Sequence, residues 1–281
     1  MNKKLLALYG LKWNPFSPGV PAEALHVTPR IDSFCRRVQL LTAEGGFASI
    51  TGAPGTGKSV ALRILANQLA AQRDVKVAVI SRPQAGLADF YREMGDLFGI
   101  ELHPHNRWGG AKVLRQRWQT HIDSALITPV LIIDEAQEMA SAVLAELRLL
   151  SSTRLDSHTL LTVVLAGDGR FVERLRSDEF LPLESRMRVR LTMERATPEI
   201  LQGCLRHALH QAGAPTLMAS AVIAALADHA QGNLRALMIM ADELLAAAAE
   251  RNARQIDEAL FFDACAIASG PETKGAARRQ R

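Results

Sequence analysis

The sequence contains few cysteines, no long apolar run and no recognisable signal-peptide pattern in its first residues, and each of these features argues against a class of protein. Three cysteines are spread over 281 residues without metal-ligand spacing, which excludes a disulfide scaffold and indicates reduced thiols. No stretch reaches the roughly 18 apolar residues of a membrane span, and the most apolar helical stretch, Leu234 to Ala249, is interrupted by Asp242 and Glu243. Near the start, Lys12 and Asn14 interrupt any signal-peptide core. We therefore expect a cytoplasmic protein without a membrane segment.

The charge balance gives little indication of a basic binding face. The formal net charge is only +4, and four basic side chains lie within residues 274–281, so the rest of the chain is close to neutral. These side chains are Lys274, Arg278, Arg279 and Arg281. With 48% apolar and 22% charged residues, the composition is that of an ordinary globular protein. The basic character is thus mostly a property of the C-terminal tail, whose composition is typical of a disordered segment.

Apolar runs alternate with helical patterns over the first two thirds of the chain. The runs that we expect to form strands are residues 47–50, 75–80, 129–133, 160–165 and 189–193. Strands that are apolar on both faces and separated by helices predict a buried parallel sheet. After Arg195 the pattern becomes helical, and Thr197 and Pro198 have the composition of a helix start.

These patterns divide the chain into four expected segments. The first 30 residues are rich in turn formers and predict an extended arm with few regular elements. The segments are the N-terminal arm 1–30, an α/β domain 31–195, a small all-helical lid domain 196–269 and a basic tail 270–281.

The clearest motif lies between the first expected strand and a helix. It matches the phosphate-loop pattern G-x-x-x-x-G-K-[ST] at every fixed position. The residues expected to contact a nucleotide are Gly52, Ala53, Pro54, Gly55, Thr56, Gly57, Lys58, Ser59 and Val60. Backbone N–H groups of such a loop and the following helix N-terminus attract phosphates. Lys58 is expected to contact the β- and γ-phosphates, and the Ser59 hydroxyl to bind Mg²⁺.

A pair of carboxylates follows the third expected strand. Asp134 and Glu135 come directly after Leu131-Ile132-Ile133, at a strand end where open α/β sheets bind ligands. In this pattern Asp134 holds Mg²⁺ and Glu135 polarises the attacking water, so we predict hydrolysis of ATP to ADP and phosphate. The alternative is an ordinary acidic helix start.

The residues Asp134-Glu135-Ala136-Gln137 resemble the second nucleotide motif of one AAA+ ATPase group. That group includes the ExeA-like secretion ATPases and the transposition ATPases TniB and TnsC. The resemblance extends from about Leu8 to Ala266 and implies a P-loop AAA+ domain followed by a helical lid. The other segments that carry it are Tyr9-Gly10-Leu11, Asn14-Pro15-Phe16, Val164-Leu165-Ala166-Gly167 and Gly232-Asn233-Leu234-Arg235-Ala236.

The resemblance also implies roles for single residues. Arg186, Arg188 and Arg190 precede and enter the fifth expected strand, where AAA+ proteins have an arginine that reaches the nucleotide of a neighbouring subunit. Arg186 is the first choice for this role and Arg188 is the second. A solvated arginine face is the alternative. Arg235 matches the lid arginine that reaches the phosphates. Asp168 occupies the position of a polar sensor at the end of the fourth strand; its charge would oppose the γ-phosphate and could slow hydrolysis. The alternative is a turn residue.

Contacts with adenine and with DNA are less well defined. Pro15-Phe16 and His26-Val27 lie where relatives fold the N-terminus over the base, and a hydrophobic staple is the alternative. Arg82, Arg107 and Lys112 are candidates for contacts with the DNA backbone. The alternative is that the residues after Lys112 form an ordinary amphipathic helix, which buries Trp118 and does not contact DNA. The apolar residues at helical spacing in this segment are Leu114, Trp118, Ile122 and Leu126.

The function that the resemblance favours is regulation of transposition. The protein would assemble with ATP and Mg²⁺ into a ring or helical homo-oligomer on duplex DNA, select target DNA and recruit or activate a DDE-type transposase. The alternative is an ExeA-like ATPase of a type II secretion or assembly system. Such ATPases usually add a membrane span and a periplasmic region, and this sequence ends at residue 281 without either. A nucleotide switch without hydrolysis is a third possibility, which Lys58, Asp134 and Glu135 oppose.

Overall fold

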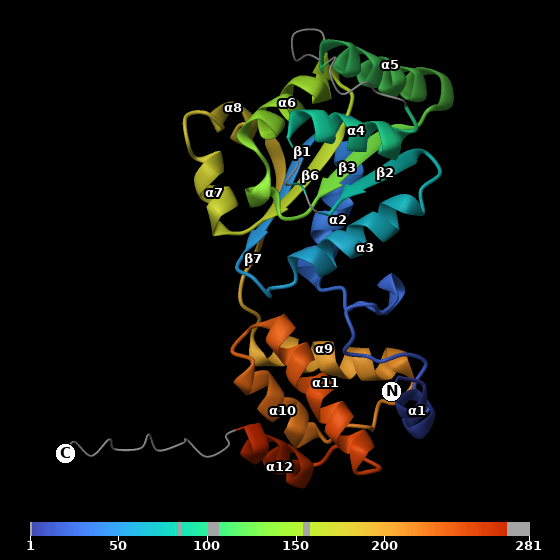
Figure 1. The fold of residues 1–281 in the computed structure, drawn as a ribbon, viewed down its shortest axis with the longest axis vertical. Coiled ribbons are helices and arrows are strands. Elements are labelled where there is room, and N and C mark those ends of the chain that lie inside the picture. The colour runs from blue at the N-terminus through green and yellow to red at the C-terminus, as the bar shows by residue number, and fades with distance from the viewer. Residues whose placement is uncertain (1, 82, 84–85, 101–106, 154–157, 269–281) are drawn as a thin grey trace, which may run out of the picture. The chain divides into compact units, whose positions relative to one another are not determined.

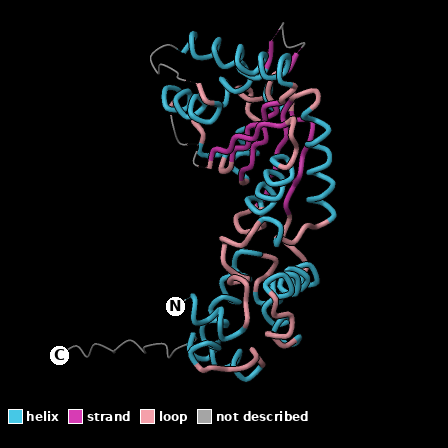
Figure 2. Tube along the Cα trace, turned by 90° about the vertical axis from the view of Figure 1, so that its right-hand side faces the viewer, coloured by secondary structure: helices cyan, strands magenta, loops and turns pink. Residues whose placement is uncertain are grey.

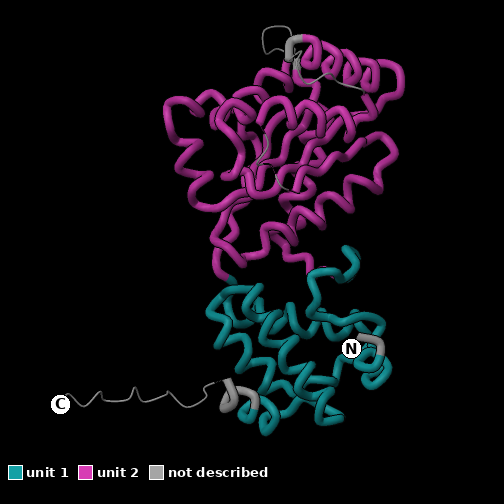
Figure 3. Tube along the Cα trace, in the orientation of Figure 1, with its two compact units in different colours: residues 1–24, 196–281 teal, residues 25–195 magenta. Residues whose placement is uncertain are grey.

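The chain folds into two compact units. The structure is a computed structural model that describes residues 2–81, 83, 86–100, 107–153 and 158–268. One unit consists of residues 25–195, and the other combines the described residues up to 24 with those from 196 onward (Figure 3). The first unit is an α/β domain and the second is helical (Figure 1).

The α/β unit is built on a five-stranded parallel sheet with the order β2-β3-β6-β1-β7. The strands are β1 (Gly46–Gly52), β2 (Val75–Ile80), β3 (Thr128–Ile133), β6 (Thr162–Gly167) and β7 (Met187–Met193). Each of the five expected apolar runs coincides with one of these strands, so the predicted parallel sheet is confirmed. A short antiparallel pair, β4 (Ser152–Thr153) and β5 (His158–Thr159), lies outside this sheet.

Helices cover both faces of the sheet (Figure 2). The strands have a side-chain period of two, so alternate residues enter opposite cores. In β3, Val130 and Ile132 pack in the core under α2 and α3, whereas Leu131 and Ile133 pack in the core under α4, α5 and α6. The helices of this unit are α2 (Pro29–Thr42), α3 (Lys58–Ala70), α4 (Leu87–Phe98), α5 (Arg107–Ala125), α6 (Ser141–Ser151), α7 (Gly169–Leu175) and α8 (Leu181–Glu184).

The helical unit has its own apolar core. Its first long helix begins as the sequence predicts: the Thr197 hydroxyl accepts a hydrogen bond from the N–H of Ile200 at 3.4 Å, and Pro198 is the first helical residue. The elements are α1 (Asn2–Tyr9), η1 (Ala22–Ala24), α9 (Pro198–Ala212), α10 (Ser220–His229), α11 (Leu234–Glu250) and α12 (Glu258–Ala268).

The N-terminal residues belong to this helical unit, which corrects the expectation of an extended arm. Residues 2–9 form helix α1, because they include several good helix formers and the turn-forming residues begin only at Gly10. Leu5, Leu11 and Phe16 are buried in the core of the helical unit. The N–H of Lys12 donates to the carbonyl of Ala212 at 2.9 Å.

Among the described residues, Cys35 and Cys204 are buried free cysteines that form no disulfide. Burial raises the pKa of the Cys35 thiol to about 11 and that of Cys204 to about 11, so both stay protonated at neutral pH and are poor nucleophiles. Among the helices that the structure describes, none is long and apolar enough to cross a bilayer.

We predict that Phe16→Ala destabilises the helical unit by about 3–5 kcal/mol, because it leaves a cavity in a core where Phe16 is 4% exposed. Leu8→Ala is the matched control, since Leu8 is 43% exposed on the same segment. Urea unfolding followed by circular dichroism measures both changes. Weaker ATP binding by Phe16→Ala, without a loss of stability, would instead return Phe16 to the role of a base-stacking residue.

Candidate nucleotide site

The phosphate-loop sequence connects the C-terminal end of β1 to the N-terminus of α3. Gly55 and Gly57 have φ values of 81° and 99°, in the left-handed region that glycine adopts without strain. The Thr56 hydroxyl donates to the carbonyl of Ala53 at 2.8 Å and closes the turn. The loop therefore wraps around the positive end of a 13-residue helix, where backbone N–H groups attract anions.

Lys58 is the first residue of α3, and its side chain turns back toward the loop. Its ammonium group donates to the carbonyl oxygens of Gly52 at 2.9 Å and Ala53 at 3.2 Å. The residue is 7% exposed, whereas Ser59 next to it is exposed. The loop thus contains a nearly buried cation beside an accessible hydroxyl, which suits a triphosphate accompanied by a divalent cation.

Gly52 is required for packing of the sheet as well as for the loop. A Cβ atom at this position would lie 2.4 Å from the carbonyl oxygen of Met193 at the end of β7. From its place in the motif, this glycine is expected only to serve the turn around the phosphates. Its neighbour across the sheet could not be identified from the motif, because β7 is more than 130 residues away along the chain.

The two carboxylates lie at the same edge of the sheet as the loop. Strands β3, β6 and β1 are parallel neighbours, so their C-terminal ends share one edge. Asp134 and Glu135 are both half-buried. One oxygen of the Asp134 carboxylate accepts a hydrogen bond from the N–H of Glu135 at 2.9 Å. Glu135 has φ 53° and ψ 42°, a left-handed conformation that is uncommon for glutamate.

Gln137 joins the acid pair to the next strand. Its side-chain amide nitrogen donates to the Glu135 carboxylate, and its amide oxygen accepts from the N–H of Asp168 at 3.2 Å. In the sequence, Gln137 is part of the motif that carries the AAA+ resemblance, and the motif alone predicts no role for it. The signal available in the sequence was a glutamine two residues after the acid pair.

Residues 42–175 match the AAA domain family. The chain has the P-loop AAA+ fold. Solved structures with this fold include the Orc1 protein of Aeropyrum pernix in complex with DNA, which is 17% identical with a TM-score of 0.69 over 90% of this chain and 68% of its own. The Thermotoga maritima Holliday junction branch migration motor RuvB is also 17% identical, with a TM-score of 0.61 over 89% of this chain and 72% of its own.

One curated protein is similar over most of the chain. General secretion pathway protein A of Aeromonas hydrophila is 27% identical over 253 residues, which cover 88% of this chain. The chain spans 45% of the length of that relative.

In the α/β unit, Asp168 is the N-cap residue of α7. Its carboxylate accepts hydrogen bonds from the N–H of Arg170 at 2.9 Å and from the guanidinium of Arg170 at 3.0 Å. The pKa of Arg170 is raised, chiefly by this hydrogen bond to Asp168 and further by Glu138. The expected repulsion of the γ-phosphate by Asp168 is therefore reduced, and the geometry favours the alternative of a turn residue.

Two of the three candidate trans-acting arginines, Arg186 and Arg188, lie toward the N-terminal ends of the strands, opposite the phosphate loop, whereas Arg190 pairs with Ser49 in the middle of β1. Phe47 at the start of β1 pairs with Met187, so Arg186 is roughly 20 Å along the strand from Gly52, at about 3.3 Å per residue. Arg186 donates to the carbonyl of Pro182. Because of this distance, Arg186 cannot serve the phosphate loop of its own chain.

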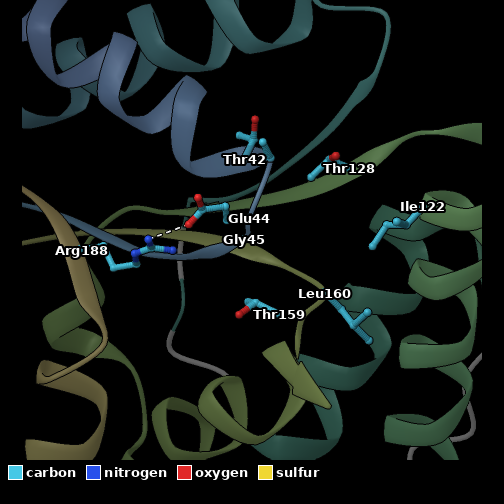
Figure 4. A pocket seen from close by; sticks show the side chains of 9 residues that line it. Thr42, Glu44, Gly45, Ile122, Thr128, Thr159, Leu160 and Arg188 are labelled. Atoms are coloured by element: carbon cyan, nitrogen blue, oxygen red, sulfur yellow. Dashed lines mark ion pairs between the residues drawn. The ribbon is translucent and has the colours of Figure 1, made fainter. Parts of the chain in front are cut away.

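Arg188 and Arg190 both pair with carboxylates of their own chain. The Arg188 guanidinium lies 2.6 Å from the Glu44 carboxylate (Figure 4), and Arg190 lies 2.7 Å from Glu184. The pocket of Figure 4 is at this same N-terminal edge and is therefore separate from the nucleotide site. Its lining includes Thr42, Glu44, Gly45, Ile122, Thr128, Thr159, Leu160 and Arg188.

The remaining candidates are more scattered. Arg235 is exposed in the first turn of α11, which Asn233 caps by accepting from the N–H of Ala236 at 3.1 Å. Lys112 is exposed on α5, whereas Arg82 and the side chain of Arg107 lie outside the described residues.

Two aromatic side chains, Trp118 and Phe16, are buried in apolar cores. Trp118 is 0% exposed and packs edge-on against Phe98 at 5.4 Å, as the amphipathic-helix alternative predicts. Phe16 lies in the core of the helical unit, which removes it as a candidate for stacking on adenine.

We predict that Asp168→Asn retains both stability and ATP turnover, because an asparagine oxygen still caps α7. Asp168→Ala should lose about 1 kcal/mol of stability through loss of the cap, again with little change in turnover. Thermal unfolding and steady-state phosphate release measure the two effects. A large change in turnover for Asp168→Asn, with stability intact, would show that the carboxylate acts on the nucleotide.

Proposed function

We propose that the AAA+ domain binds ATP with Mg²⁺ at the C-terminal edge of its sheet and hydrolyses it. The observation that carries this proposal is the presence of the phosphate loop and the acid pair at one edge of a parallel sheet. An ammonium group, helix N–H groups, a hydroxyl and two carboxylates form a donor set that fits a magnesium–nucleotide complex.

The residues of the site have distinct roles in this proposal. Lys58 and the N-terminus of α3 hold the phosphates, and Ser59 and Asp134 hold the cation, which when bound would neutralise charge on the phosphates. Glu135 orients a water molecule and accepts its proton. Loss of Lys58 should therefore weaken binding, whereas loss of the Glu135 carboxylate should lower turnover to a small residual rate.

We propose further that the protein works as a homo-oligomer. Arg186 lies at the edge opposite the phosphate loop, so a head-to-tail contact between copies would bring it to the nucleotide of a neighbour. A planar, permanently charged guanidinium suits stabilisation of charge on a phosphate. Arg235 is the proposed contribution of the helical unit to the same phosphates.

The curated relative favours a secretion-type role. Its similarity extends over 88% of this chain, and its name refers to general secretion. The transposition role, in which the oligomer would act on duplex DNA and a DDE-type transposase, rests on the sequence resemblance. The DNA-bound Orc1 structure shares the fold at 17% identity and does not extend DNA binding to this chain. We therefore propose an ATPase of a secretion or assembly system, with transposition as the alternative.

A mixing experiment tests the shared site. Lys58→Ala and Arg186→Ala should each have little ATPase activity, because each removes a different half of the site. In a one-to-one mixture, about one interface in four contains both intact halves if copies assemble head to tail at random. We therefore expect phosphate release to recover to about a quarter of the wild-type rate.

Arg188→Ala is the comparison variant for the mixing experiment. Because Arg188 pairs with Glu44, we expect this variant to retain most of its activity alone. No recovery by folded Lys58→Ala and Arg186→Ala proteins would contradict a trans-acting Arg186. Loss of activity in Arg188→Ala, together with recovery in its mixture with Lys58→Ala, would transfer the role to Arg188. Duplex DNA added to wild-type protein separates the pathways: salt-sensitive stimulation of turnover would favour transposition.

A further inference from the structure

Gln137 occupies a buried position between the acid pair and β6. It lies in the short helix η2 (Ala136–Glu138) and is 9% exposed. Its amide group contacts the Glu135 carboxylate on one side and the backbone N–H of Asp168 on the other. Asp168 follows the last residue of β6, so a single side chain joins the ends of two neighbouring strands.

The partners of Gln137 determine which way its amide points. A backbone N–H can only donate, so the group that faces Asp168 must be the amide oxygen. The amide nitrogen then faces Glu135 and donates to its carboxylate. A hydrogen bond to a charged acceptor is stronger than one between neutral groups, and burial at this position keeps water from replacing it.

The backbone around Gln137 is also held in place. The guanidinium of Arg174, on α7, donates to the carbonyl oxygens of Gln137 and Met139, both at 2.8 Å. The same guanidinium lies over the Phe180 ring, 5.4 Å from its centroid. Glu135 itself is in the left-handed conformation. The segment from Glu135 to Met139 is thus fixed by α7 and by the end of β6.

We propose that Gln137 is a positioning residue for hydrolysis, which holds the Glu135 carboxylate at a fixed place relative to the end of β6. The inference rests on the proposed ATPase function and adds a residue to it. Gln137 acts through Glu135 and contacts neither phosphate nor metal in this scheme. Its loss should therefore affect the rate of hydrolysis and spare the binding of nucleotide.

Two substitutions separate the contacts of Gln137. Gln137→Met has a similar length and removes both hydrogen bonds. Gln137→Glu retains an acceptor for the N–H of Asp168 but opposes Glu135 with a like charge. We expect both to lower kcat for ATP by about 10- to 100-fold, because small misplacements of a reacting group have effects of this size. The KM for ATP should stay within about threefold, since ground-state binding is unchanged.

Glu138→Gln is the matched control on the same segment. Glu138 lies beside Gln137 and pairs with Arg170 at 2.8 Å, and we expect its substitution to leave kcat nearly unchanged. Binding of a fluorescent ATP analogue to each variant shows that it is folded.

A double variant tests whether Gln137 acts through Glu135. In a Glu135→Gln background, the added Gln137→Met change should lower turnover no further, because the group that it positions is already absent. A further 10- to 100-fold loss, roughly the single-variant effect, would show a general structural role and overturn the inference. Wild-type kcat in Gln137→Met, or an increase, would overturn it as well. Absence of ATPase activity in the wild-type protein would overturn the proposed function itself, whereas an active wild type with unaffected Gln137 variants would overturn only this inference.

Discussion

Parallel pairing of β3, β6 and β1 places the phosphate loop, the acid pair and the start of α7 at one edge of the sheet. Ile133 pairs with Leu165, and Thr51 pairs with Gly167. A shift of one residue in either pairing would turn alternate side chains to the wrong core. Both cores are well buried, so the register is strongly determined by packing. The chemistry proposed for this edge depends on that register more than on any single hydrogen bond.

At the same end of the strands, two backbone segments pass so close to their neighbours that only glycine fits. A Cβ atom on Gly52 would lie 2.4 Å from the carbonyl oxygen of Met193, and one on Gly167 would lie 2.5 Å from the Cβ of Phe171. Glycine lets β1 approach β7 and lets β6 turn directly into α7. From α7, Arg170 pairs with Glu138 and Arg174 holds the carbonyls of Gln137 and Met139. The acid-pair segment is therefore positioned by a neighbouring element as well as by its own strand.

The parts of the fold that depend on local sequence were predictable. Apolar runs identified the strands, and Thr197 with Pro198 identified the start of α9, because capping and fixed φ act within a few residues. The site was less predictable where its contacts span long sequence distances. The approach of Met193 to Gly52 and the link from Gln137 to Asp168 depend on which strands become neighbours. The burial of Phe16 among helices about 200 residues later has the same cause.

The central claim is that one sheet edge both binds and hydrolyses ATP, with separate residues for the two steps. Parallel measurement of ATP affinity and single-turnover phosphate release for wild type, Lys58→Ala and Glu135→Gln tests it most directly. The account predicts that Lys58→Ala loses affinity, whereas Glu135→Gln keeps wild-type affinity and loses turnover, because Lys58 contacts the phosphates and Glu135 serves the attacking water. Wild-type turnover in Glu135→Gln, or unchanged affinity in Lys58→Ala, would contradict the account.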